Sequence, residues 1–238
     1  MSWNKNKIVV QYKFESDIKS VVYQLYKMPI DLDFDYFAQQ NTYLETIQCI
    51  PKNHRKLYSL YNQDTSLYIV DTKDIKKDVI YIMKNVTGDV DYYLDTINEY
   101  LSIISGGGTL NNNSKIMMKN GELRDYRIIG YKLKNHLAVP QFANQFLLKE
   151  GIIKFYNFID STKLNVQAYA YEDFKILLKF MNSCQFVEEN DNLFFSFYKL
   201  LIKNKEIVNS TKNLLAVFYQ IQLYFTIINT PEKFYDYF

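Results

Sequence analysis

The sequence is poor in the residues that break or bend a polypeptide chain. Its 238 residues include only 7 glycines and 4 prolines, against 22 tyrosines and 17 phenylalanines. Few breakers and many aromatic side chains favour helices packed around an aromatic core. Hydrophobic residues make up 48% of the chain and charged residues 23%, which is typical of a globular protein. The length allows one large domain or two ordinary ones.

Cysteine and histidine are also scarce, which limits the available chemistry. The two cysteines, Cys49 and Cys184, lie far apart in the sequence, and this favours a reducing compartment over a disulfide framework. The two histidines, His54 and His136, have no metal-ligand spacing to other ligands, and the sequence contains no CxxC or HExxH motif. We therefore expect no metal, no cofactor and no enzymatic activity.

Neither a strong charge excess nor a long apolar run is present. The formal net charge is only +2, whereas dedicated nucleic-acid binders carry a clear basic excess, so we expect no nucleic-acid partner. No stretch reaches the ~18 apolar residues of a membrane span. The N-terminal MSWNKNKIVV has too short an apolar run for a secretory signal. We expect a cytoplasmic protein.

The first part of the chain predicts an α+β domain over residues 1–87. Two runs rich in Val and Tyr, 7–14 and 19–26, read as an antiparallel hairpin. Apolar residues at helical spacing predict a helix over 32–50, capped by Asp31 or Asp33 and closed by Pro51. Three more short strands are expected at 56–62, 66–71 and 78–83. This order is that of a ubiquitin-like roll, in which one helix packs across a mixed sheet.

Residues 88–238 predict an all-α domain. The low-complexity stretch SGGGTLNNNSK lacks the Lys-Ser/Thr of a phosphate-binding loop, so we expect a flexible loop over 105–120. Helical spacing of apolar residues predicts helices over 89–104, 121–138, 140–160, 165–183, 192–204 and 210–229. The segment 214–228 is apolar almost all round, which predicts a central helix with neighbours on several sides.

Residues 140–160 show how these helices are organised. Pro140 is at a first helical position, and Gly151 is at a position where a helix can end in a left-handed conformation. Apolar residues repeat one face on both sides of Gly151, so neither half can bury its face alone. That is typical of a helical repeat unit, which is stable when stacked on neighbours.

An exposed edge strand is the feature of the first domain that is best suited to binding. The second strand of the hairpin is an edge, and an edge can extend its hydrogen-bond ladder into the sheet of a partner. Alternation lets only half of its side chains face outward. The predicted partner-binding residues are Lys13, Lys19, Ser20, Val22, Tyr23, Tyr26 and Lys27.

Three stretches give the chain a resemblance to a known family. Residues 58–85 (YSLYNQDTSLYIVDTKDIKKDVIYIMKN), 142–160 (FANQFLLKEGIIKFYNFID) and 166–182 (VQAYAYEDFKILLKFMN) carry it. Their order and spacing are similar to the N-terminal region of ELMO proteins and to the GTPase-binding/FH3 region of amoebozoan formins. The resemblance implies a Ras-binding-type ubiquitin-like domain followed by armadillo-like helical repeats. The chain lacks the actin-assembly part of a formin and the later ELMO domains, which implies a fragment or a short paralogue.

The function implied by this resemblance is that of a non-enzymatic adaptor in actin-cytoskeleton signalling. The first domain would bind a GTP-bound small GTPase of the Rho or Ras family, and the repeats would bind other signalling proteins. Recruitment to the membrane or the actin cortex is part of this expectation.

The chain departs from the family pattern at the start of the predicted helix. Raf-like effectors carry basic residues there, facing acidic GTPase switches. This chain has Asp31, Asp33 and Asp35, and no Lys or Arg from Met28 to Pro51. We interpret the three aspartates as helix capping rather than metal binding. Like charges across an interface reject a partner, so the GTPase contact uses another face, or the partner differs, or GTPase binding is lost.

Two other functions stay open. The first is recruitment to an anionic membrane or an acidic protein by basic residues that follow Pro51. The residues of this alternative basic patch are Lys52, Arg55, Lys56, Lys73, Lys76, Lys77 and Lys84. The second is a structural repeat segment of a larger protein with no partner of its own.

Overall fold

The computed structural model describes two compact units of the chain. The described residues are 10–15, 21–26, 28–39, 50–105, 115–117, 123–154 and 164–190, with single positions 199, 215, 219, 222, 223 and 226. The chain divides into Met1–Val90 and Asp91–Phe238, which we call unit 1 and unit 2. The sequence predicted a division between residues 87 and 88.

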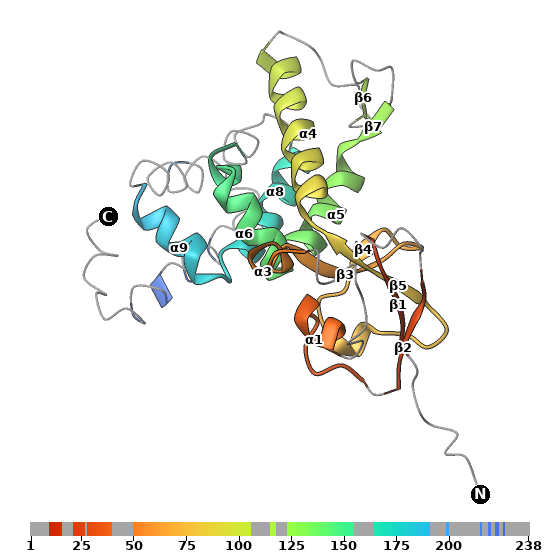
Figure 1. The fold of residues 1–238 in the computed structure, drawn as a ribbon. Coiled ribbons are helices and arrows are strands. Elements are labelled where there is room, and N and C mark those ends of the chain that lie inside the picture. The colour runs from red at the N-terminus through yellow and green to blue at the C-terminus, as the bar shows by residue number, and fades with distance from the viewer. Residues whose placement is uncertain are drawn as a thin grey trace, which may run out of the picture. The chain divides into compact units, whose positions relative to one another are not determined.

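Unit 1 is built on a five-stranded mixed sheet. The strands are β1 (Val10–Phe14), β2 (Tyr23–Leu25), β3 (Tyr58–Asn62), β4 (Leu67–Tyr68) and β5 (Ile80–Asn85). Their order across the sheet is β2-β1-β5-β3-β4 (Figure 1). β1 and β5 run parallel, and the other neighbours are antiparallel. Among the described residues, β2 and β4 therefore form the two edges of the sheet.

The helix α1 (Phe34–Gln39) packs on one face of this sheet. Successive side chains of a strand point to opposite faces, and accordingly alternate residues of β1 are buried. The ring of Tyr12 lies 4.8 Å from that of Phe37, centroid to centroid, and its hydroxyl donates a hydrogen bond to the Phe37 carbonyl at 2.9 Å. Phe34 packs edge-on against Phe14 at 5.2 Å. Aromatic pairs between the sheet and α1 thus hold the core of unit 1.

The predicted order of two strands, one helix and three strands is confirmed. Within it, β4 has only two residues, fewer than the predicted strand at 66–71. The predicted helix at 32–50 is described only as far as Gln39 and again at Ile50; residues 40–49 lie outside the described part.

Two short helices of unit 1 were not predicted. α3 (Lys52–Arg55) begins directly after Pro51, where the sequence predicted only the end of a helix. A 3-10 helix, η1 (Thr72–Asp74), is capped by the Asp71 carboxylate, which accepts a hydrogen bond from the Lys73 N–H at 2.9 Å. Four and three residues are too few to show a helical period in the sequence.

Unit 2 is mainly helical. Its elements are α4 (Thr87–Ser105, which begins in unit 1), β6 (Lys115–Met117), β7 (Leu123–Asp125), α5 (Tyr126–Leu137), α6 (Pro140–Leu148), α8 (Leu164–Leu177) and α9 (Met181–Glu188). Residues 151–154 are also helical. In the core of this unit the rings of His136, Tyr93 and Phe142 pack against one another, with His136 at 5.1 Å from Tyr93 and 5.3 Å from Phe142. The buried imidazole is a packing group here.

Two predictions for this unit were wrong. The domain is not all-α, because β6 and β7 form an antiparallel hairpin, and β6 lies inside the predicted loop at 105–120. Strands of three residues show too little alternation to be recognised. The predicted helix at 165–183 is two helices, α8 and α9, separated by residues 178–180.

Of the helix predicted at 210–229, only residues 215, 219, 222, 223 and 226 are described. Leu215, Tyr219 and Leu223 are exposed apolar side chains on one face, and the predicted neighbours on its other sides stay a prediction. The helix predicted at 192–204 lies outside the described residues apart from Lys199.

Gly151 has a different role from the predicted one. Glu150 takes the left-handed conformation, with φ of 57°, and Gly151 is already helical. The absence of a side chain at Gly151 matters because a Cβ there would lie 2.5 Å from two ring carbons of Phe146 and 2.5 Å from its carbonyl oxygen. Glycine therefore lets the chain after α6 approach α6 closely.

We predict that Gly151→Ala lowers the free energy of unfolding of unit 2 by about 1–3 kcal/mol, because the new methyl group overpacks against Phe146. Urea unfolding of the full chain measures this change. Gly88→Ala is the control, since its Cβ would meet nothing within 4 Å and alanine favours a helix. Equal effects of the two substitutions would contradict the prediction.

Candidate functional site

The β2 edge of the sheet carries the largest group of exposed apolar side chains in the described part of unit 1. Tyr23 and Leu25 face α1, and the Tyr23 ring lies 5.8 Å from that of Tyr12. By the same alternation, residues 22, 24 and 26 point to the other face of the sheet. The Tyr26 hydroxyl donates to the side chain of Gln24 at 3.0 Å, which agrees with this placement.

The exposed apolar residues around β2 form what we call the β2 strip. Val22 is 42% exposed and Tyr26 is 61% exposed, and Ile30 reaches 80%. Single exposed apolar side chains are ordinary, whereas a group of them is a candidate interaction surface. The β2 strip consists of Val21, Val22, Tyr26, Met28 and Ile30.

The structure places four of the seven predicted partner-binding residues. Val22 and Tyr26 are exposed on the β2 strip, and Lys13 is half-buried on β1, on the face opposite to α1. Tyr23 is partly buried and packs against the core. The other three, Lys19, Ser20 and Lys27, lie outside the described residues.

Sequence reasoning missed Met28 and Ile30. Both follow β2 and flank a buried proline, Pro29, in a segment with no regular structure. A strand alternation cannot extend to them, because it ends with the strand. The signal available in the sequence was an apolar residue on each side of a turn-forming proline.

The acidic residues at the start of α1 are part of the local structure. The Asp33 carboxylate accepts a hydrogen bond from the Tyr36 N–H at 2.6 Å, which confirms the predicted cap. The Asp35 carboxylate forms an ion pair with Arg55 at 3.3 Å. The Arg55 guanidinium also lies 5.8 Å from the centre of the Phe34 ring and donates to the Ile50 carbonyl at 3.2 Å.

The residues of the alternative basic patch come from two connections and from β5. Three of them precede β3, whose first residue pairs with the last residue of β5, and these are Lys52, Arg55 and Lys56. Three others lie in the connection that precedes β5, and these are Lys73, Lys76 and Lys77. The two groups thus come from separate connections of unit 1.

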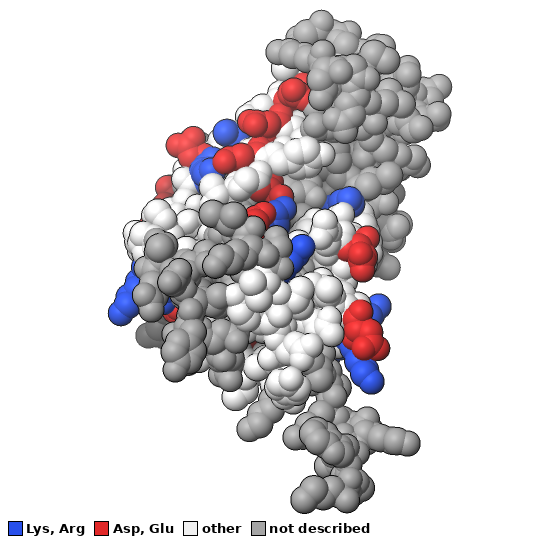
Figure 2. Space-filling model, turned by 45° about the vertical axis from the view of Figure 1, so that its right-hand side comes forward, with Lys and Arg blue, Asp and Glu red and all other residues white. Residues whose placement is uncertain are grey.

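Charge pairing weakens this basic patch further. Arg55 is bound to Asp35, and Lys84 is bound to Asp89 at 2.8 Å. On the face drawn in Figure 2, the described lysine and arginine side chains lie singly or beside carboxylates rather than in one continuous area. A surface that attracts anionic lipids needs several unpaired cations close together.

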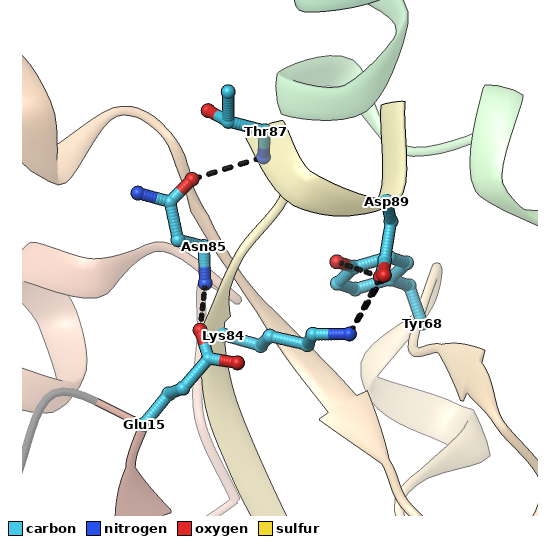
Figure 3. Close-up of polar contacts among 6 residues, drawn as sticks. All are labelled: Glu15, Tyr68, Lys84, Asn85, Thr87 and Asp89. Atoms are coloured by element: carbon cyan, nitrogen blue, oxygen red, sulfur yellow. Dashed lines mark hydrogen bonds and ion pairs between the residues drawn. The ribbon is translucent and has the colours of Figure 1, made fainter. Parts of the chain in front are cut away.

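Asp89, in the first turn of α4, contacts two other polar side chains of unit 1. Its carboxylate accepts a hydrogen bond from the Tyr68 hydroxyl at 2.7 Å and is 2.8 Å from the Lys84 ammonium (Figure 3). The same ammonium lies 4.5 Å from the centre of the Tyr61 ring. Asp89 therefore joins α4 to two strands of the sheet, β4 and β5.

A second set of contacts fixes the end of β5. The Asn85 N–H donates to the Glu15 carboxylate at 3.0 Å, and the Asn85 side-chain oxygen accepts from the Thr87 N–H at 2.9 Å (Figure 3). The Val86 N–H donates to the Leu57 carbonyl at 2.8 Å. We call the six residues of Figure 3 the β5–α4 junction: Glu15, Tyr68, Lys84, Asn85, Thr87 and Asp89.

The ionisable groups of the described core favour structure over catalysis. Burial, and then the charge of Asp89, raise the pKa of Tyr68 far above its usual value, so its phenol stays protonated and donates. Burial raises the pKa of the Cys184 thiol to about 11, which keeps the thiol un-ionised and unreactive. Within the described ranges, no group of three His, Cys, Asp or Glu residues is placed to hold a metal ion.

Comparison with known proteins adds no relative. No protein-family model matches the sequence, and no curated protein matches it significantly. In the part of the chain that the structure describes, none of the helices combines the length and the apolar character needed to cross a membrane.

We predict that Tyr68→Phe lowers the free energy of unfolding by about 1–2 kcal/mol, because one hydrogen bond to a carboxylate is lost. Asp89→Ala lowers it by about 2–3 kcal/mol, since both the Tyr68 hydroxyl and the Lys84 ammonium lose their partner. Urea unfolding measures both changes.

The matched control is Asp91→Ala, on the same helix. Asp91 is also paired with a lysine, Lys149, but both side chains are more exposed than those of Lys84 and Asp89. Its loss lowers the free energy of unfolding by less than about 1 kcal/mol. If Asp91→Ala lowers the free energy of unfolding as much as Asp89→Ala does, the prediction that the β5–α4 junction stabilises unit 1 is contradicted.

Proposed function

We propose that this chain is a non-enzymatic adaptor that binds a GTP-bound small GTPase of the Rho or Ras family. The partner strand pairs with the exposed edge of β2 and extends the sheet of unit 1. The observation that carries this proposal is the position of β2 at the edge of the sheet, together with the apolar β2 strip.

The arrangement of unit 1 supports a ubiquitin-like roll of the Ras-binding type. The order β2-β1-β5-β3-β4, the parallel pair of β1 and β5, and a helix packed on one face are the arrangement expected of that roll. In such a domain the second strand is an edge beside the first. That edge provides main-chain hydrogen bonds, and the side chains beside it provide specificity.

The acidic start of α1 does not oppose this docking. Asp33 and Asp35 belong to a helix that packs on one face of the sheet, whereas Val22 and Tyr26 point to the other face. A partner strand that contacts the edge and the outer face is therefore separated from these two carboxylates by the sheet. Of the three readings left open by the sequence, this favours a GTPase contact that does not use the start of α1.

The helices of unit 2 support the second part of the proposal. Neighbouring helices such as α5 and α6, which are in contact and joined by a short connection, are compatible with armadillo-like repeats that offer a surface to other signalling proteins. The proposed location is the cytoplasm, with recruitment to the membrane or the actin cortex through the bound GTPase.

The test is a binding screen with a panel of Rho- and Ras-family GTPases, each loaded with a GTP analogue or with GDP. Biolayer interferometry with the full chain immobilised gives the affinity in each state. At least one GTPase is expected to bind more tightly in the GTP state, because its switch segments order only there. Equal or absent binding in both states across the panel rejects the proposal.

We predict that Val22→Lys weakens the GTP-state complex about tenfold or more, because a charge on an edge strand opposes the addition of another strand. The matched control is Val70→Lys, which lies just after β4 at the opposite edge of the sheet. Val22 and Val70 are 42% and 43% exposed, so the two substitutions cost similar stability. Equal loss of binding in both variants would place the contact elsewhere.

A further inference from the structure

Helix α8, which packs against α5 in unit 2, contains a buried carboxyl group. Ala170, Asp173, Phe174 and Leu177 follow one another at helical spacing along α8, and all four are buried. Asp173 is only 1% exposed, so an acidic residue occupies a buried position that an apolar side chain would suit better. One of its carboxylate oxygens is buried and has no hydrogen-bond partner in the described part of the chain.

An ion pair lies beside this carboxyl group. The Lys134 ammonium of α5 is 2.8 Å from the Glu172 carboxylate of α8, and both side chains are partly exposed. Glu172 repels a second negative charge at Asp173, whereas Lys134 attracts one. Tyr131 on α5 also interacts electrostatically with the Lys134 ammonium. Lys175 is the next charged residue along α8.

The neutral form of Asp173 is favoured in the folded chain. Burial, and then the charge of Glu172, raise its pKa well above the usual value, and Lys134 offsets only part of this. A neutral carboxyl group leaves Lys134 with a single anionic partner. If Asp173 ionises, two adjacent carboxylates compete for the one ammonium group, and a buried charge must be solvated.

We propose that the contact between α5 and α8 is a proton-dependent clamp. It is closed while Asp173 holds its proton and Lys134 is bound to Glu172. It loosens when Asp173 loses that proton and draws Lys134 away from Glu172. This device is independent of the GTPase contact, because all of its residues belong to unit 2.

The direction of the pH dependence follows from proton linkage. In the unfolded chain Asp173 ionises near pH ~3.9, whereas the folded chain retains the proton to higher pH. Between these two values the folded chain binds more protons, so its stability is complete at the acid end and decreases as pH rises. The opening equilibrium shifts by up to about tenfold per pH unit, and the shift ends above the folded pKa.

The experiment compares the wild-type chain with Asp173→Asn, which has nearly the same shape and is neutral at every pH. Amide hydrogen exchange of α8 is measured in both proteins at a series of matched pH values. We expect the wild-type protection to fall relative to Asp173→Asn as pH rises, by up to about tenfold per unit. Equal protection of the two proteins at all pH values overturns the proposal.

A direct titration keeps the test decisive if the variant is poorly folded. The 13C signal of the Asp173 carboxyl carbon in the wild-type chain reports its ionisation, and a midpoint near pH ~3.9 overturns the proposal. Glu172→Gln should lower that midpoint, because it removes a repelling charge and releases Lys134. Asp95→Asn, an exposed substitution on α4, should leave it unchanged; the same midpoint in all three proteins also overturns the proposal.

Discussion

The parallel pairing of β1 with β5 determines which residues of unit 1 are available to a partner. Parallel neighbours require a long connection, and here α1, β3 and β4 all lie between them in sequence. Because β5 occupies one side of β1, β2 can pair with β1 only on its other side, which is the edge of the described sheet. The register that pairs Tyr12 with Tyr81 also turns both rings into the buried core, because both are fully buried. One pairing therefore decides the composition of the core and the location of the exposed edge.

Asp89 provides the second constraint, because it joins contacts that are distant in sequence. A carboxylate in the first turn of a helix is favoured by the helix dipole. Here the same group accepts from Tyr68, which is 21 residues earlier in the chain, and pairs with Lys84. A partly buried carboxylate with several donors is stable only if all of them stay in place. The start of α4 is consequently fixed to the sheet by charge as well as by apolar packing.

The sequence predicts the parts of this fold that local patterns encode. Alternation and polar turns give the order of the strands and the helix along the chain of unit 1, and the exposure of Val22 and Tyr26 follows from their place on an edge. The break between α8 and α9 has no glycine or proline at residues 178–180, so the sequence gives no sign of it. The contact of Tyr68 with Asp89 depends on tertiary packing, which no local period contains. Asp173 looks in the sequence like an ordinary charged residue of an amphipathic helix.

The acidic residues at the start of α1 already interact within the chain, whereas the β2 strip contains no charged residue. Asp33 and Asp35 are near the surface, yet a helix cap and an ion pair with Arg55 already engage them. They therefore contribute less to the field outside the molecule than a count of acidic residues suggests. None of the five side chains of the β2 strip is charged. In the proposed complex, shape, apolar contact and main-chain hydrogen bonds therefore select the partner, and charges at the rim set its rate of association.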